Sequence, residues 1–340
     1  MIEAAIVGLG WWGKTLVEAV QQDSKEIRFV AGTTRTKTPE VHAFAESQKF
    51  ALADTYESLL ANPKVDAVVL ATPHSMHAQQ VIAAAAAKKH VFCEKPFALT
   101  KESAQQAVSA MRNAGVTLGL GYNRRFHPEI TKLRSRIRAG ELGTILHLEA
   151  TMTFPNALLL KPDAWRADPR ETPCGGLTPM GVHAIDGMID LCGPIDQVFA
   201  QSFRRAVAVN ADDTTSILFR MKEGMSGYLG TMTATGPGFS FQVFGSKGWV
   251  RLEGMTHVAG VSSEERRTRL FGACKFQPIK GPAETWEAER LDVTRAALEA
   301  FAHAASGGST YPITPEEMIH GVAVTEAIVR SASAGRVEKV

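Results

Sequence analysis

The N-terminal part of the chain alternates short apolar runs with amphipathic segments. The runs have the length and composition of buried strands, and the segments between them repeat apolar residues every three or four positions. This alternation is typical of a doubly wound parallel sheet covered by helices. The predicted strands are Glu3–Gly8, Arg28–Thr33, Ala67–Ala71, Val91–Cys93 and Thr117–Gly121, and the predicted helices are Gly13–Gln22, His77–Lys88 and Lys101–Ala114.

The pattern changes near Asn123. A helical period over 129–138 ends at Gly140, and longer runs follow in which apolar and polar residues alternate, with few helical segments between them. Such a series is typical of a large, mostly antiparallel, open-faced sheet in an α+β domain. Residues 255–285 show no pattern that we can assign. The predicted strands are Ile145–Thr153, Gln197–Arg204, Thr214–Met221, Met225–Ala234, Ser240–Gly245 and Trp249–Glu253.

Two helices are predicted to close the chain, one over 287–305 and one that begins at Thr314. Thr314, Pro315 and Glu317 combine an N-cap, a proline at the first helical position and a glutamate at the third. We therefore predict an α/β protein in which residues 1–122 form a Rossmann domain and residues 123–340 form an α+β domain.

Composition narrows the function classes. The chain has 37 basic and 35 acidic residues, so its net charge of +2 gives no reason to expect nucleic acid or an anionic membrane as a partner. No apolar run approaches the ~18–20 residues of a membrane span, and the first residues resemble a strand more than a signal peptide. The 4 cysteines are far apart in the sequence, so we expect no zinc site, no disulfide framework, no metal and a cytoplasmic location.

A glycine-rich hexapeptide follows the first predicted strand. Gly8, Gly10 and Gly13 form G-x-G-x-x-G, which is weak evidence alone but here connects a strand to a helix. Gly8 permits the tight turn, Gly10 lets backbone N–H groups approach a pyrophosphate, and Gly13 lets helix and strand pack closely. The helix N-terminus would stabilise the phosphate charge, so we predict a dinucleotide site.

The end of the second predicted strand indicates which dinucleotide binds. An acidic residue about 20 residues past the glycines would bind the ribose 2′-hydroxyl of NAD. The chain instead continues as Thr33-Thr34-Arg35-Thr36-Lys37. Arg35 can pair with a 2′-phosphate and Thr34 can donate a hydrogen bond to it, so NADP(H) is preferred and NAD(H) remains possible. The alternative is that Arg35 and Lys37 are solvated loop charges.

Several motifs together resemble the Gfo/Idh/MocA oxidoreductases, a family that includes glucose–fructose oxidoreductase, inositol dehydrogenases and dihydrodiol dehydrogenases. The resemblance covers almost the whole chain, and its most specific element is Glu94-Lys95-Pro96. It implies a Rossmann domain followed by an open-faced α/β domain that pairs into dimers or tetramers. The motifs are the glycine turn, Ala71-Thr72-Pro73 with His77, Glu94-Lys95-Pro96, Gly121-Tyr122-Asn123-Arg124-Arg125-Phe126, Trp165-Arg166 and Gly181-Val182-His183-Ala184-Ile185-Asp186.

Lys95 is the strongest candidate for proton transfer. It follows a strand at the carboxyl edge of the predicted sheet, where open α/β sheets bind ligands. A partly buried lysine beside a cationic nicotinamide should have a lowered pKa, which suits acid–base catalysis. The resemblance assigns the matching lysine this role, and Glu94 is expected to position Lys95 or contact the cofactor. The alternative is an ordinary surface lysine.

His183 is the second catalytic candidate, and it also counts as a substrate-binding one. On a helix beginning near Thr178 and Pro179, His183 and Asp186 share a face, so Asp186 can orient the imidazole or bind a substrate hydroxyl. The resemblance implies an aspartate four residues before His183, where this chain has Pro179. Because proline offers no polar side-chain group, Thr178 is a candidate replacement, or the substrate differs from the common sugars and inositols.

The remaining expected site residues come from the same motifs. Trp165 can stack on a sugar face or pack in a core. The expected cofactor contacts outside the glycine and Arg35 motifs are Trp11, Trp12, Ala71, Thr72, Pro73, His77, Glu94, Lys95 and Arg166, and the expected substrate contacts are Asn123, Arg125, Trp165, Thr178, His183 and Asp186.

These residues predict an NADP(H)-dependent oxidoreductase that transfers a hydride to or from a CH–OH or C=O group of a sugar, cyclic polyol or related small molecule. Two alternatives stay open: a glycoside hydrolase that uses a tightly held nicotinamide, and a non-catalytic dinucleotide sensor on the same fold. Lys95 and His183 count against the sensor. A homodimer or homotetramer built through the C-terminal sheet is expected.

Overall fold

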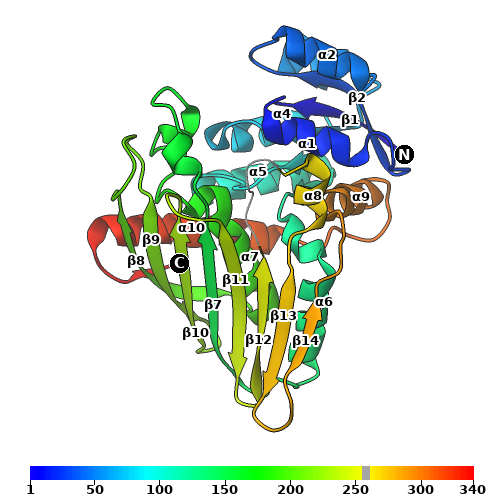
Figure 1. The fold of residues 1–340 in the computed structure, drawn as a ribbon. Coiled ribbons are helices and arrows are strands. Elements are labelled where there is room, and N and C mark those ends of the chain that lie inside the picture. The colour runs from blue at the N-terminus through cyan, green and yellow to red at the C-terminus, as the bar shows by residue number, and fades with distance from the viewer. Residues whose placement is uncertain (255–260) are drawn as a thin grey trace. The chain divides into compact units, whose positions relative to one another are not determined.

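The computed structural model describes residues 1–254 and 261–340 (Figure 1). The chain forms two compact units. Unit 1 comprises Met1–Asn123 and Asp292–Ile319, and unit 2 comprises Arg124–Leu291 and His320–Val340. The boundary drawn from the sequence after residue 122 therefore leaves out a C-terminal segment that packs with unit 1.

Unit 1 contains the predicted parallel sheet. Its strands lie in the order β3-β2-β1-β4-β5-β6, and each pairs in parallel with its neighbour. Strand β4 is buried along its whole length, as expected for a strand covered by helices on both faces. The strands are β1 (Ile2–Val7), β2 (Ile27–Thr33), β3 (Ala51–Leu52), β4 (Ala67–Leu70), β5 (His90–Cys93) and β6 (Leu118–Leu120).

The helices of unit 1 confirm three predicted helices and add two that the sequence pattern did not indicate, α2 and α3. The predicted α5 is capped by Thr100, which accepts the N–H of Ser103, and ends at Gly115 in the left-handed conformation. The helices of residues 1–123 are α1 (Trp11–Val20), α2 (Pro39–Ser47), α3 (Tyr56–Leu60), α4 (His77–Ala86) and α5 (Lys101–Ala114), with short turns η1 (His74–Met76) and η2 (Asn123–Phe126).

Helix α9 (Val293–Ala305) returns the chain to unit 1. Its Phe301 ring packs against Phe92 of β5 at 5.7 Å between centroids, and Arg295 pairs with Asp23 at 2.6 Å. The helix starts later than the sequence predicted, because Asp292 caps it by accepting the N–H groups of Thr294 and Arg295. The predicted start of this helix at Glu287 was wrong, because Glu287 is the last residue of the strand Glu284–Glu287.

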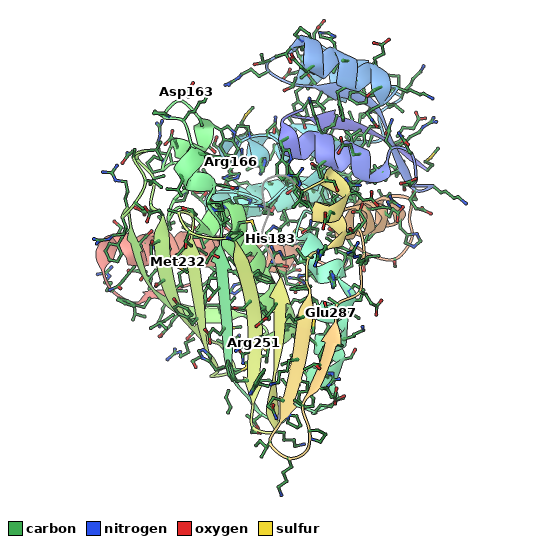
Figure 2. All side chains as sticks on the ribbon, viewed as in Figure 1. Asp163, Arg166, His183, Met232, Arg251 and Glu287 are labelled. Atoms are coloured by element: carbon green, nitrogen blue, oxygen red, sulfur yellow. The ribbon has the colours of Figure 1, made fainter. Side chains whose placement is uncertain are left out.

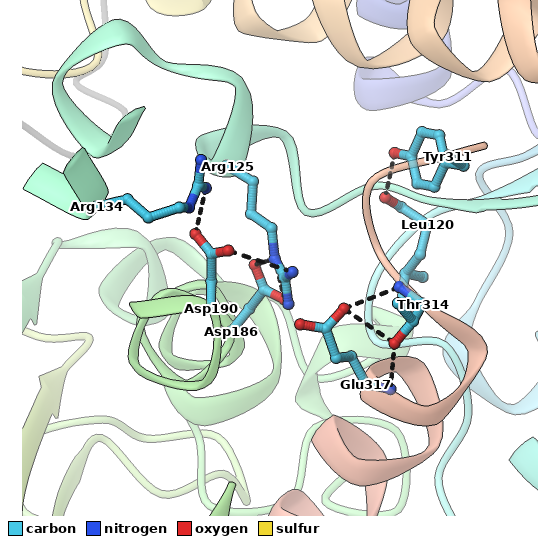
Figure 3. Close-up of polar contacts among 8 residues, drawn as sticks. All are labelled: Leu120, Arg125, Arg134, Asp186, Asp190, Tyr311, Thr314 and Glu317. Carbon is cyan, nitrogen blue, oxygen red and sulfur yellow. Dashed lines mark hydrogen bonds and ion pairs between the residues drawn. The ribbon is translucent and has the colours of Figure 1, made fainter. Parts of the chain in front are cut away.

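The capping box predicted for the last helix is confirmed. Thr314 accepts the N–H of Glu317, whose carboxylate accepts the N–H and hydroxyl of Thr314 in return (Figure 3). Helix α10 then runs over Pro315–Ala334. Just before it, the Tyr311 hydroxyl donates to the carbonyl of Leu120 at 2.8 Å, which joins this segment to the end of β6.

Unit 2 is built on a sheet that has nine strands in the part of the chain that the structure describes. All neighbours are antiparallel except β7 and β10, so the predicted mostly antiparallel sheet is confirmed. In the sheet order the strands are β14 (Glu284–Glu287), β13 (Ala273–Pro278), β12 (Gly248–Gly254), β11 (Gly238–Gly245), β7 (Ile145–Thr153), β10 (Ser226–Met232), β9 (Thr214–Met221), β8 (Ile195–Phe203) and β15 (Glu338–Lys339).

The region 255–285, which the sequence left unassigned, contains β13, the start of β14 and the short helix α8 (Ser263–Thr268), while 255–260 lie outside the described residues. The main helices of unit 2 lie on one face of the sheet, behind it in Figure 1. They are α6 (Pro128–Arg138), α7 (Val182–Cys192) and the later part of α10, and three short turns precede α7: η3 (Asn156–Leu159), η4 (Trp165–Ala167) and η5 (Leu177–Gly181).

Strand register places a continuous row of residues on the other face of this sheet. Leu218 of β9 pairs with Tyr228, Tyr228 with Glu149, Glu149 with Gln242, and Gln242 with Arg251. The row combines apolar, aromatic and charged side chains, and Leu218 is 55% exposed. Along β9 the intervening residues are buried, so the alternation predicted from the sequence is the alternation between the two faces.

No helix among the described residues is both long and apolar enough to cross a membrane.

Candidate functional site

The glycine turn connects β1 to α1 through close backbone contacts. Gly8 has φ 97°, and a Cβ there would lie 2.6 Å from the carbonyl oxygen of Ala71. A Cβ on Gly13 would lie 1.9 Å from the oxygen of Gly8. Both positions therefore require glycine for the turn and for packing, as the motif predicts.

Gly10 differs because an added Cβ would meet no atom within 4 Å. No atom of the described residues therefore fills the space next to the Cα of Gly10, and a ligand can approach the backbone closely there. Gly10 is also the N-cap of α1 and provides no capping side chain, and the first turn has no acidic residue. The N–H groups at this helix end are thus directed at a position that suits a phosphate, so the turn fits a bound dinucleotide.

The end of β2 lacks the carboxylate that favours NAD. Thr33 is buried and its hydroxyl donates to the carbonyl of Ala53, while Thr34 is half-buried and Arg35 is exposed. Lys37 pairs with Asp54 at 2.7 Å. Arg35 is therefore the basic residue of this segment that is exposed to solvent and has the freedom to meet a ligand.

The Glu-Lys-Pro motif follows the carboxyl end of β5. Lys95 is half-buried, the Lys95–Pro96 bond is cis, and Phe97 is fully buried. The fully buried His77 lies between this turn and the Ala-Thr-Pro turn, with Nδ1 2.8 Å from the Pro96 carbonyl oxygen and Nε2 3.0 Å from that of Thr72. The ring thus joins the two turns expected at the cofactor, and its nitrogens contact backbone rather than solvent.

Glu94 is a buried carboxylic acid of unit 1. Its carboxylate is buried, accepts the N–H of Lys95 at 3.3 Å, and lies against the Cα of Gly121. Burial raises the pKa of Glu94 to about 7, although the charge of Lys95 and the indole N–H of Trp12 act in the opposite direction. Trp11 packs beside Trp12 at 5.4 Å and is 49% exposed.

His183 lies in the first turn of α7 in unit 2 and is buried. Helical backbone begins near Thr178, as predicted, because Leu177–Gly181 forms a π-helical turn continuous with α7; its N-cap is Gly176. Left-handed backbone at Cys174 and Gly175 sets the start of that turn earlier than Thr178. The Thr178 hydroxyl is buried and, among the described residues, has no hydrogen-bond partner.

Arg125 and Asp186, both expected to bind substrate, are bound to each other. The Arg125 guanidinium makes a two-pronged contact with the Asp186 carboxylate, at 2.7 to 3.0 Å (Figure 3). Asp190, one turn further along α7, lies 3.5 Å from Arg125 and 2.5 Å from Arg134 of α6. All four side chains are largely buried, so this network fixes α7, and with it His183, against α6 and η2.

The other expected site residues are distributed over both units. Asn123 of unit 1 donates to the Thr294 hydroxyl at 3.3 Å. In unit 2, the Arg166 guanidinium lies 4.1 Å from the centre of the Trp165 ring, on the short turn η4 (Figure 2 labels Arg166 and His183). This turn packs through Ala167 on an apolar cluster with Val207 and Val209. Trp165 is half-buried and Arg166 is exposed.

Sequence reasoning missed three residues that shape these places: Gly121, Asp190 and Arg134. Gly121 belongs to a motif that we identified, but only the fold shows that its missing side chain makes room for Glu94. Asp190 lies four residues after Asp186, so it shares that helix face, and this spacing was the available signal. Nothing in the sequence links Arg134 to either aspartate.

Comparison with known proteins agrees with both halves of this description. Residues 2–122 match the oxidoreductase family with an NAD-binding Rossmann fold, and residues 130–251 match the GFO/IDH/MocA C-terminal domain. The rhizopine catabolism protein MocA of Rhizobium meliloti is 32% identical over 80% of this chain and 78% of its own length. Myo-inositol 2-dehydrogenase of Thermotoga maritima is 28% identical over 78% of this chain and 79% of its own. Aldose-aldose oxidoreductase from Caulobacter crescentus, solved with glycerol, has the same fold, with a TM-score of 0.85 at 24% identity over 100% of this chain and 99% of that one.

The Arg125–Asp186 pair makes a testable prediction about stability. Arg125→Met leaves Asp186 buried without its counter-charge and should lower the free energy of unfolding by about 3–5 kcal/mol. The measurement is the urea midpoint, with the exposed Arg138→Met on α6 as the matched control. Equal midpoints for the two variants would show that the buried pair does not stabilise unit 2.

Proposed function

Because the chain belongs to the Gfo/Idh/MocA oxidoreductase family, we propose that it is an NADP(H)-dependent dehydrogenase or reductase. Its substrate on this proposal is a sugar, cyclic polyol or related small molecule with a CH–OH or C=O group. The observation that carries the proposal lies within unit 1. The open turn at Gly10 and the half-buried Lys95 both follow strands at the carboxyl edge of one parallel sheet.

The nicotinamide, when bound, supplies the position that accepts or donates hydride. In the oxidative direction the substrate carbon loses hydride, the hydroxyl loses its proton to Lys95 Nζ, and a carbonyl forms; reduction reverses each transfer. His183 is the second proton-transfer or hydrogen-bonding group on this proposal, held on α7 by the buried network of Arg125 and Asp186. Ala71, Thr72, Pro73, Trp12 and His77 shape the cofactor site.

The family resemblance implies an aspartate at position 179, where this chain has a proline. On this proposal the neighbouring Thr178 provides the polar group instead. Its buried hydroxyl, without a partner among the described residues, is available to a substrate hydroxyl or a bridging water. Asn123, Trp165 and Arg166 complete the proposed set of substrate and cofactor contacts. A threonine hydroxyl can both donate and accept a hydrogen bond, whereas an ionised carboxylate only accepts, so either a hydroxyl or a carbonyl oxygen of the substrate can bind at this position.

Replacement of Lys95 tests the proton transfer. Lys95→Met keeps the length of the side chain and removes its amine, so kcat should fall by about 10³-fold while NADPH affinity stays nearly constant. The assay is absorbance of reduced nicotinamide across aldoses, inositols, cyclic diols and sugar acids, with cofactor fluorescence titration in parallel. Turnover retained by the variant would place proton transfer elsewhere. Cofactor binding with release of reducing sugar and no net reduction would favour the hydrolase instead.

Arg35 is proposed to select NADP(H). Arg35→Asp removes the cation and restores an acid that can bind a ribose 2′-hydroxyl, so the preference for NADPH over NADH should fall by about 10- to 100-fold. Dissociation constants for both cofactors, measured by fluorescence, test this. Lys37→Asp is the comparison, because Lys37 is already paired with Asp54. An unchanged ratio in the Arg35 variant would remove the assignment.

We further propose that the exposed face of the unit 2 sheet joins two copies of the chain. The row from Leu218 through Tyr228 to Arg251 places an exposed leucine beside aromatic and charged groups across adjacent strands. Tyrosine and arginine are enriched at subunit interfaces relative to the rest of a protein surface. In a two-fold symmetric contact each residue lies on a patch that meets its own copy.

Leu218→Arg should therefore lower the sedimentation coefficient to that of a monomer, because it places charge in a desolvated contact in both copies. Ile279→Arg is the control, since Ile279 is 70% exposed and lies beyond the end of β13. A monomeric parent protein, or identical sedimentation of both variants and the parent, would contradict the proposed interface.

A further inference from the structure

The burial of Glu94 is not explained by the proposed chemistry, which gives this residue no role. It is 5% exposed, although it directly precedes the half-buried Lys95. A Cβ on Gly121 would lie 2.6 Å from its Oε1, 2.8 Å from its carboxyl carbon and 2.9 Å from its Oε2. The carboxylate therefore lies against the Cα of Gly121. The Cβ of any other residue at position 121 would occupy the space that the carboxylate fills.

The carboxylate has few groups that stabilise its charge. It accepts the Lys95 backbone N–H at 3.3 Å, and the indole N–H of Trp12 also favours the ionised form. Burial opposes ionisation more strongly, so the pKa of Glu94 rises to about 7. Among the described residues, Lys95 and the Cys93 thiol interact with it electrostatically, and burial keeps the pKa of Cys93 well above its usual range. Cys93 therefore stays neutral near pH 7, whereas Lys95 carries a charge that favours ionised Glu94.

An electrostatic interaction between two groups acts equally on both. If the ammonium of Lys95 favours the ionised form of Glu94, then ionised Glu94 favours the ammonium of Lys95 by the same free energy. Partial burial and a nearby cationic nicotinamide both lower the pKa of a lysine. A fixed carboxylate opposes these effects, and a lysine whose pKa lies near the working pH can both accept and return a proton.

We propose that Glu94 is a positioning residue for Lys95: its carboxylate, held against Gly121, sets how strongly the lysine amine retains a proton. This inference rests on the proposed role of Lys95 in proton transfer. It assigns Glu94 an electrostatic action on the neighbouring amine in place of a direct contact with substrate or cofactor. It also explains why residue 121 is a glycine although its φ is not in the left-handed region.

The test measures the protonation of Lys95 directly and needs no substrate. The chain without added cofactor is treated with a trace of acetic anhydride over a range of pH, and acetylation of Lys95 is quantified by mass spectrometry, because only the free amine reacts. In Glu94→Gln the midpoint of Lys95 acetylation should move to lower pH by about one unit. Glu94→Asp keeps the charge and should retain most of the parent midpoint.

Gly121→Ala is an independent variant, since its methyl group must displace the carboxyl of Glu94. It should also shift the Lys95 midpoint, whereas Gly236→Ala, with open space around it, should not. Glu102→Gln is the matched charge control on exposed surface of the same unit, and the other lysines report general effects of each substitution.

An unchanged Lys95 midpoint in Glu94→Gln, with the folded state verified by circular dichroism, would overturn the inference. So would an equal shift in Glu102→Gln. A large loss of NADPH affinity in Glu94→Gln without a shift would show that Glu94 serves the cofactor instead. The Lys95→Met assay decides separately whether Lys95 transfers the proton. The acetylation midpoint can shift even if Lys95 does not transfer the proton, and Lys95 can transfer the proton even if Glu94 does not shift the midpoint.

Discussion

The close approach of backbone at the carboxyl edge of the unit 1 sheet is the constraint on which the site depends. Gly8 and Gly13 bring the β1–α1 turn against itself and against Ala71 at the end of β4, where a single methyl group would overlap backbone oxygens. Helix α1 begins directly after this tight turn, with Gly10 as an N-cap that provides no capping side chain. The same edge carries the Ala-Thr-Pro turn and the Glu-Lys-Pro turn, and His77 joins the two through their carbonyl groups. The positions of the phosphate-binding turn and of Lys95 thus follow from one packing arrangement.

Burial of charge decides the chemistry that these positions can support. In unit 2, Arg125 and Asp186 neutralise each other at contact distance, and the pair stabilises the helix that carries His183. In unit 1, Glu94 is buried against Gly121, and the cost of desolvating its carboxylate appears as a raised pKa. Two acids of similar burial therefore behave differently: Asp186 is paired with Arg125 and holds a helix, whereas burial raises the pKa of Glu94 to about 7.

Much of the fold could be predicted because local pattern and tertiary environment agree. Strands such as β4 are uniformly apolar since both faces are covered, and strands such as β9 alternate since only one face is. The prediction failed where tertiary contacts override the local signal. Strand β13 and the edge strand β14 are short, and α9 starts at the Asp292 cap rather than at Glu287, where the amphipathic pattern begins.

By itself, the sequence determined the glycine turn, the lack of an acid after β2 and the placement of Lys95 after a strand, because each of these is a property of neighbouring residues. It could not determine that Arg125 meets Asp186 across 61 positions, that His77 contacts Pro96, or that Gly121 makes room for Glu94. Those contacts join segments that are distant along the chain. Only the packing of strands and helices brings them together, and burial there, which no local pattern measures, decides which charged groups are paired and which can titrate.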